Sequence, residues 1–296
     1  MAHILQKVRD LATNVYIAFA GAIASICGFF WVIYDKFSPA PSEVLQLIIL
    51  LLIGLIFAVI SYYSIRVRQE NAAFIRAAAT IHKINHDYRD ALSKMFGGKQ
   101  PVANEIDRIQ CERETLQAVC QSAAKIFNSF TQADCMVTIK LIAKEKNGAL
   151  TCQTYVRSQL NCDRDVYSST SFAINTGQNT AFDEALRFAA GSISCFYSAD
   201  LSEMAKNGKY RNQRDNWANY YQSAIVVPIR YVNPQRAGRP DASDDIGFLC
   251  VDTQWTHRLN NGYHVHYLAA LADQMYNFMS LMRGGYRVPP IEPPAP

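Results

Sequence analysis

The segment KNGKYRNQRDNWANYY, residues 206–221, combines basic and aromatic side chains at close spacing. Cations recognise phosphates and aromatic faces stack on bases, so this mixture is typical of a site for a nucleotide or a single-stranded oligonucleotide. The alternative is a solvated loop whose aromatic residues anchor a core and whose charge is partly offset by Glu203 and Asp215. The predicted ligand-binding residues are Lys206, Lys209, Tyr210, Arg211, Arg214 and Trp217, with Arg157 and Arg230 as weaker additions.

The remaining sequence carries no familiar catalytic motif. We find no ATP-binding half of a kinase, no G-x-x-x-x-G-K-[ST], no G-x-S-x-G and no H-E-x-x-H. His82, His86 and Asp90 share one helical face, which suggests a metal site or a histidine kinase, but neither a third metal ligand nor a kinase domain is evident. The sequence therefore predicts a protein that is not an enzyme and that holds no metal or cofactor.

The cysteines and the net charge exclude two further classes of protein. None of the eight cysteines forms a C-x-x-C pair, and several fall on predicted core faces, as reduced buried thiols do in a cytosolic domain. A disulfide framework or a structural zinc site is therefore not expected, while redox or haem sensing remains a minor alternative. The net charge of +4 is too small to indicate a dedicated duplex-DNA binder.

Two uncharged apolar runs predict a membrane hairpin at the N-terminal end. Val44 to Ile65 holds 22 residues without a charge, and a helix of that length spans roughly 33 Å, enough for a bilayer core. Val15 to Tyr34 is a second such run, and the loop DKFSPAPSE between them contains helix-breaking prolines. A cleaved signal peptide is the competing interpretation of the first run. It is disfavoured because the run is long and ends in the bulky residues FFWVIY.

Basic residues at the ends of the two runs predict their orientation. Lys7 and Arg9 precede the first run, and Arg66 and Arg68 follow the second, while the connecting loop offers only Lys36. Because basic residues stay on the cytoplasmic side, both termini are expected in the cytoplasm of a multi-pass inner-membrane protein.

The first run also carries a row of small residues, Ala20, Ala24 and Gly28, at spacings of four. Such rows allow the backbones of membrane helices to approach closely. They predict membrane-helix association, either within the hairpin or as a self-association or pore-lining face of a homo-oligomer.

A helical stalk is predicted from Arg66 to Phe96, ending before Gly97-Gly98. Apolar residues recur there at spacings of three and four, as in a coiled-coil seam that carries oligomerisation or a signal. The seam residues are Phe74, Ala77, Ile81, Ile84, Tyr88, Ala91 and Met95.

The remaining chain alternates between helical and strand periodicity, which predicts an α+β domain with an antiparallel sheet and flanking helices. A helix over 104–130, with Ile106 and Ile109 at the start of its inward face, precedes two strands joined by Asn147-Gly148, a strong hairpin signal. The further predicted elements are a short helix at 180–190, a strand at CFYS, an irregular polar segment over 200–221 and strands at 223–231 and 246–252. A long helix at 262–282, with Leu268 and Met275 among its inward residues, closes the domain.

Three stretches of this domain, SAIVVPIR, IGFLCVD and HYLAALADQMYNF, resemble the central strands and C-terminal helix of GAF domains. The resemblance covers residues 112–283. It implies a pocket for a small ligand, commonly a cyclic nucleotide, between the sheet and the middle helices, although some GAF domains only dimerise. The NKFDE-type signature of cyclic-nucleotide phosphodiesterases is absent.

Taken together, these patterns predict five regions: a cytoplasmic N-terminus (1–14), a transmembrane hairpin (15–65), a helical stalk (66–100), a GAF-like sensor (101–285) and a Pro-rich disordered tail (286–296). This plan resembles the two-transmembrane effectors of nucleotide-signalled bacterial anti-phage systems. The resemblance implies a permeability or pore output, a lipid bilayer and an anionic nucleotide-type or short single-stranded oligonucleotide ligand as partners, and a cognate nucleotidyltransferase. The alternative is a membrane-tethered GAF module for dimerisation or interaction in signal transduction.

Overall fold

The computed structural model describes Gly28, Trp31 and residues 43–96, 105–146, 148–159, 171–187, 194–232 and 243–283. The chain divides into two compact units, Met1–Phe74 and Ile75–Pro296. The predicted tail, Ala20 and Ala24 lie outside the described residues.

Helix α3, Glu43–Phe96, is a single helix of 54 residues that begins in the first unit and ends in the second. It contains the second predicted membrane run, whereas the first predicted run is described only at Gly28 and Trp31. Across the described parts of the chain, no helix emerges as a candidate membrane span. The predicted hairpin is therefore not confirmed.

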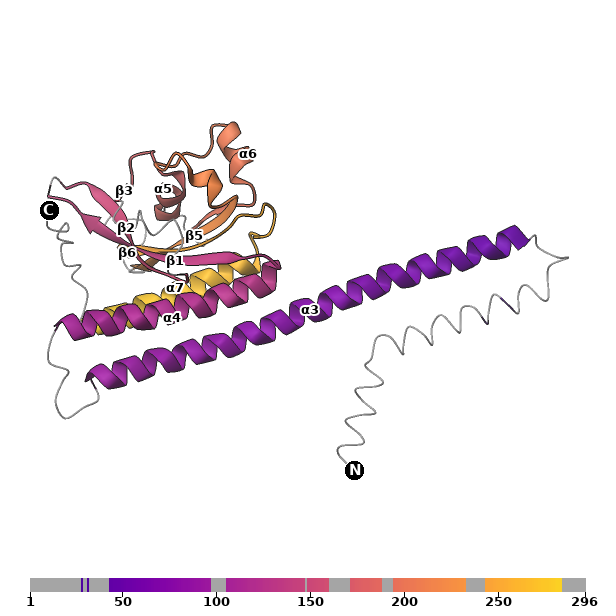
Figure 1. Ribbon diagram of the computed structural model, residues 1–296, viewed down its shortest axis with the longest axis horizontal. Helices are drawn as coiled ribbons and strands as arrows, with labels where there is room; N and C mark the ends of the chain where they lie inside the picture. The colour runs from indigo at the N-terminus through magenta and orange to yellow at the C-terminus, as the bar shows by residue number, and fades with distance from the viewer. Residues whose placement is uncertain are drawn as a thin grey trace, which may run out of the picture. The chain divides into compact units, whose positions relative to one another are not determined.

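A six-stranded antiparallel sheet with the order β3-β2-β1-β6-β5-β4 forms the centre of the second unit (Figure 1). The strands that sequence periodicity predicted are all present, and β3 is an additional one. The six strands are β1 Cys135–Lys144, β2 Leu150–Arg157, β3 Phe172–Ala173, β4 Phe196–Ser198, β5 Ser223–Val232 and β6 Ser243–Thr253.

Helices cover both faces of this sheet, unequally. Helices α4, Glu105–Thr131, and α7, Tyr263–Met282, lie together under one face, which we call the helix face (Figure 1). The short helices α5, Thr180–Leu186, and α6, Leu201–Lys206, lie over the other, which we call the loop face. This is the predicted α+β, GAF-like arrangement.

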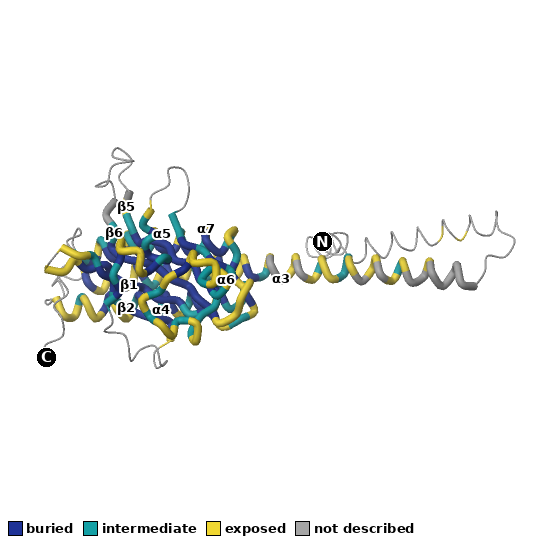
Figure 2. The backbone as a smooth tube through the Cα atoms, turned by 90° about the horizontal axis from the view of Figure 1, so that it is seen from above, coloured by how far each residue is buried: buried dark blue, intermediate teal, exposed yellow. Residues whose placement is uncertain are grey.

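The strands send alternate side chains to the two faces, as the period of two in a β-strand requires. In β1, Val137, Ile139 and Leu141 belong to the apolar core of the helix face. Ile142 belongs to a second core on the loop face, together with Phe172, Phe182, Phe196 and Phe248. Figure 2 shows the buried backbone concentrated in this sheet and its helices.

The end of α3 belongs to the helix-face core. Ile84, Tyr88, Ala91 and Met95 are buried there, and the Tyr88 ring stacks on Phe278 of α7 with centroids 4.4 Å apart. The predicted coiled-coil seam therefore packs, over these residues, against helices of its own chain. A sequence pattern gives the apolar stripe of a helix but does not identify what covers it.

Two details of the predicted elements were wrong. Ile106 and Ile109 were expected on the inward face of α4, but they are 75% and 42% exposed. Residues 200–221 were expected to be irregular, but they contain α6 and a 3-10 turn at Trp217–Asn219. The side chain of Asp200 caps α6 by accepting from the backbone N–H of Glu203 at 2.9 Å.

Candidate ligand-binding site

An irregularity in the β1–β2 pairing decides which polar side chains enter the loop face. Ile139 pairs with Val156, but Lys140 pairs with Thr154, so Tyr155 is an extra residue in β2. The resulting β-bulge places Thr154 and Arg157 on the same face as Lys140. Tyr155 contacts the helix side instead, where the guanidinium of Arg113 lies 5.3 Å from its ring centroid.

Lys140 and Arg157 meet at Thr154 on the loop face. Lys140 Nζ donates to Thr154 Oγ1 at 2.9 Å and lies 4.2 Å from the ring centroid of Phe172. Arg157 donates to the same oxygen at 3.3 Å and approaches the sulfur of Met136 at 3.7 Å. Both residues are less than a tenth exposed. Burying two cations side by side is costly unless each is paired or hydrogen-bonded.

Arg214 adds a third cation from the opposite wall. It lies in the loop after α6, and its guanidinium is 5.9 Å from the ring centroid of Phe172 and 5.5 Å from that of Tyr220. Lys140, Arg157 and Arg214 therefore come from three separate elements and share contacts with Thr154 and Phe172. We call this group the cation cluster.

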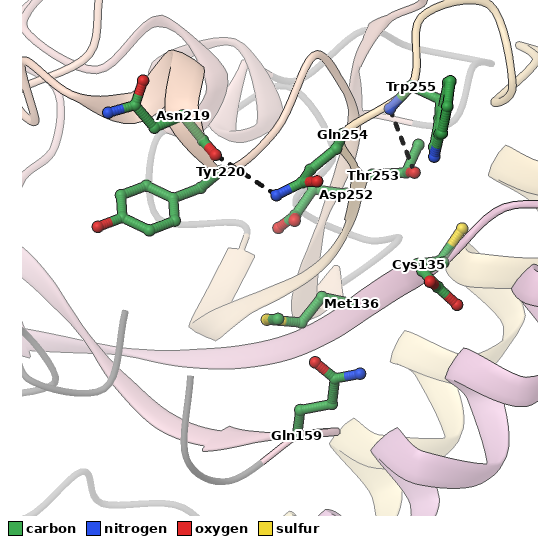
Figure 3. A pocket seen from close by; sticks show the side chains of 10 residues that line it. Cys135, Met136, Gln159, Asn219, Tyr220, Asp252, Thr253, Gln254 and Trp255 are labelled. Atoms are coloured by element: carbon green, nitrogen blue, oxygen red, sulfur yellow. Dashed lines mark hydrogen bonds between the residues drawn. The ribbon is translucent and has the colours of Figure 1, made fainter. Parts of the chain in front are cut away.

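A cavity of about 370 Å³ opens beside the cation cluster (Figure 3). Tyr220 and Asn219 border one side, Met136 and Gln159 lie opposite, and Asp252 lies between them. Gln254 crosses the space by donating to the backbone oxygen of Asn219 at 3.4 Å. The remaining lining residues are Asp134, Cys135, Thr253 and Trp255.

The cavity and the cation cluster suit different parts of one ligand. The described lining contains carboxylates, amides and aromatic rings, and neither lysine nor arginine. Such groups recognise a heterocycle that donates hydrogen bonds and stacks. Two of the cations contact residues that line the cavity. Arg157 contacts the sulfur of Met136, and the guanidinium of Arg214 lies over the ring of Tyr220. An anionic group at the rim and a ring inside the cavity would satisfy both.

The six predicted ligand-binding residues do not form one site. Lys206, Lys209 and Arg211 are exposed on the surface of the domain. Arg214 lies beside the cavity residue Tyr220 through its guanidinium, and Trp217 adjoins it through its backbone oxygen, which accepts from the Tyr220 N–H at 3.0 Å.

The two aromatic members act as core anchors, which was the alternative interpretation of this segment. Tyr210 is buried, with its ring 5.9 Å from Phe196 and 5.0 Å from Trp217. Asn212 donates to the Tyr210 hydroxyl at 2.8 Å, and burial raises the pKa of that hydroxyl well above its usual range. Arg211 contributes through its backbone, since its N–H donates to Thr180 Oγ1.

Sequence reasoning missed Lys140 and Asp252, two charged residues inside otherwise apolar strands. The signal that the sequence offered was the position of each residue in the alternation of side chains along its strand.

Of the two weaker candidates, Arg157 belongs to the cation cluster, whereas Arg230 does not. Arg230 pairs with Asp245 at 3.5 Å and donates to the backbone oxygen of Ala185, which fixes the end of α5. Burial lowers the pKa of Arg230.

The cysteines in the described ranges are free thiols, as predicted: Cys111, Cys120, Cys135, Cys152, Cys195 and Cys250. Burial raises the pKa of Cys135, in the cavity wall, to about 11 despite its hydrogen bond with Thr131. Burial also raises the pKa of Cys152 to about 12. Both thiols are therefore protonated at neutral pH. Cys27 and Cys162 lie outside the described residues.

No protein-family model and no curated protein matches this chain. Several solved structures are similar in fold. The type II free methionine-R-sulfoxide reductase of Thermoplasma acidophilum is 19% identical, with a TM-score of 0.39, over 59% of this chain and 96% of its own. The GAF domain of an Acinetobacter phosphoenolpyruvate-protein phosphotransferase is 13% identical, with a TM-score of 0.38, over 64% and 100%. The corresponding domain from Coxiella burnetii is 11% identical, with a TM-score of 0.37, over 60% and 94%.

These comparisons correct the prediction that the protein is not an enzyme. The similar structures include free methionine-R-sulfoxide reductases, which are enzymes, beside GAF domains. The prediction relied on the absence of familiar motifs, and such an absence does not exclude catalysis on this fold. Because the similarities concern the fold alone, neither activity passes to this chain.

Proposed function

We propose that this chain is a membrane-anchored sensor of a nucleotide-type ligand that alters membrane permeability when the ligand binds. The observation that carries the proposal is the convergence of Lys140, Arg157 and Arg214 beside a cavity with a ring-binding lining. A phosphate would lie at the rim between Arg157 and Arg214, where the field of the cation cluster favours negative charge. The base would enter the cavity toward Asp252 and stack against Tyr220.

The membrane part of the proposal rests on sequence and on exposure. The run from Val44 to Ile65 is uncharged. Large apolar side chains of α3 are exposed from Ile49 to Val67, among them Leu52, Ile56, Phe57 and Val59. Contiguous apolar surface of this kind marks contact with lipid or with a partner protein. We propose a hairpin in the inner membrane with both termini cytoplasmic, assembled as a homo-oligomer.

Helix α3 is the element that would connect sensing to output. It runs unbroken from Glu43 to Phe96, and its end packs on α7 through Tyr88 and Phe278. A ligand that rearranges the sheet and α7 would therefore act on the same helix that carries the apolar run. If the protein alters membrane permeability, a cognate nucleotidyltransferase would supply the ligand.

In the alternative, the hairpin is only an anchor and the domain docks a signalling partner.

Ligand binding is tested on the full-length protein in detergent micelles or nanodiscs. A panel of cyclic mononucleotides, cyclic dinucleotides and short single-stranded oligonucleotides is titrated by calorimetry at two salt concentrations. We expect Arg214→Gln to weaken binding about tenfold, roughly 1.4 kcal/mol. Lys209→Gln, a matched change of an exposed cation in the same segment, should weaken it less than about threefold. Equal losses in the two variants would place the ligand on the exposed segment, and no loss in Arg214→Gln would place it elsewhere.

The output is tested by dye release from liposomes that contain the full-length protein. If the ligand opens the membrane, Gly28→Leu should abolish release, because a bulky side chain prevents close approach of the first helices. Gly54→Leu is the matched control in the second run. An added Cβ meets nothing within 4 Å at either glycine. A wild type that never releases dye in any ligand state would leave the tethered module as the function.

A further inference from the structure

Two histidines on α3 lie within reach of one metal ion. His82 and His86 are one turn apart, and their Nε2 atoms are separated by 3.1 Å. The ring planes are inclined by 80° with centroids 4.5 Å apart, and both side chains are exposed. Within the chain alone, this geometry is that of one imidazole donating to the other, with the donor set by the tautomers.

The pair lies on the outer side of the helix. Ile84 is fully buried in the helix-face core. With about 100° of rotation per residue, His82 and His86 fall roughly 160° and 200° from it, on the opposite side of α3. The two rings therefore make no contribution to the core. They are also distinct from the cation cluster and the cavity, which lie on the loop face.

We propose that His82 and His86 chelate a divalent transition-metal ion of the zinc, copper or nickel class. Imidazole nitrogens are preferred ligands of these ions. With metal–nitrogen bonds of about 2.0–2.1 Å, two nitrogens of a tetrahedral zinc site lie roughly 3.3 Å apart. The observed 3.1 Å is within a few tenths of an ångström of that value. In the metal-bound form each neutral ring would carry its proton on Nδ1, so that both Nε2 lone pairs face the metal, with water completing its outer coordination positions.

The chelate would stiffen one turn of α3, from His82 to His86. This segment follows the uncharged run along the same helix and precedes Tyr88, which packs on Phe278. Because the metal needs both imidazoles in helical register, it favours the helical state of this turn by mass action. Metal occupancy would therefore modulate the element that joins the N-terminal part of the chain to the sensor.

The test uses the full-length, tag-free protein, Zn²⁺ alone, and competition with a chromophoric chelator. His82→Gln and His86→Gln should each weaken zinc binding at least about tenfold. His266→Gln is the matched control, an exposed helical histidine with no histidine one turn away, and should bind as the wild type does. Glutamine is a good helix former, so both test variants should fold. Equal affinity in all three variants and the wild type would overturn the proposal.

A second measurement does not depend on affinity. Hydrogen exchange of backbone amides at residues 82–90 should slow severalfold when Zn²⁺ is added to the wild type, and should not change in His86→Gln. Copper-loaded wild type should show hyperfine coupling to two imidazole nitrogens, and His86→Gln to one. Exchange that is insensitive to zinc in the wild type would contradict a chelate across this turn.

Discussion

The helix face and the loop face share the same strands but are built from different chemistry. On the helix face, β1 contributes Val137, Ile139 and Leu141 to a continuous apolar core. On the loop face, the intervening positions are Thr138 and Lys140, and the bulge in β2 adds Arg157. Only one side chain in two reaches either face, so each strand can serve stability on one side and recognition on the other.

The difference extends to the elements that cover the two faces. The helix face is closed by two long helices and the end of α3, which bury large side chains completely. The loop face is closed by short helices and loops whose aromatic residues hold charged groups in place. We infer that the helix face supplies most of the stability and that the loop face gives up stability for a polar site. Four predictions test this division, from the largest expected effect to the smallest.

Phe127→Ala should cause the largest loss. Phe127 is fully buried on the helix face against Phe130 and Tyr267, and removing such a ring costs about 3–5 kcal/mol of unfolding free energy. The equivalent change on the loop face, Phe182→Ala, should cost less because the seven-residue α5 can relax into the space. It should weaken ligand binding more, because Phe182 supports Lys140. Urea unfolding and calorimetry on both variants give the two values. A larger stability loss for Phe182→Ala would reverse the assignment of the faces.

Acid should destabilise the helix face through His264. Burial lowers the pKa of His264 to about 4, from about 6.5 in an unfolded chain. The unfolded state therefore binds a proton that the folded state excludes. The free energy of unfolding is therefore unaffected by His264 above pH 6.5, and it falls by about 3 kcal/mol in total as the pH is lowered toward 4. Unfolding measured between pH 7.5 and 4.5 should show a smaller pH dependence in His264→Gln than in the wild type. Identical slopes would contradict the assignment.

Gly247→Ala should disturb both faces at once. Gly247 lies in β6 opposite Leu141, and an added Cβ would stand 2.1 Å from the backbone oxygen of Lys140. Because the obstacle is backbone, the strands must separate, at a cost of roughly 1–3 kcal/mol. Ligand affinity should fall too, since Lys140 moves with β1. Thermal unfolding and ligand titration check both effects. A variant with unchanged unfolding temperature would show that the strands can yield at no cost.

Thr138→Val should have the smallest effect and the opposite sign. The Thr138 hydroxyl is buried on the loop face and has no hydrogen-bond partner among the described residues. Replacing it with a methyl group of similar shape should be neutral or should stabilise the fold by about 1 kcal/mol. If the hydroxyl serves the ligand, affinity should drop in the same variant. Destabilisation by more than 1 kcal/mol would show that the group is structural.

Periodicity and turn chemistry determined the order of the elements in this domain. The change from helical spacing to strict alternation predicted β1 and β2, and the residues of α7 expected inside, such as Leu268 and Met275, are buried. These signals are local, because a helix or strand that buries one side must repeat apolar residues at its own period. The short elements β3 and α6 were not predicted, because two and six residues are too few to show a period.

Only the tertiary structure decided where the charged residues meet. The basic segment at 206–221 was conspicuous in the sequence, yet its lysines remain on the surface and only Arg214 turns toward the cavity. Lys140 was not singled out and Arg157 was only a weaker candidate, yet a single bulge in β2 placed both at Thr154. Pairing register and the covering of each face depend on contacts between residues far apart in the chain. Local composition therefore specifies which elements form, whereas packing among them specifies which charges share a site.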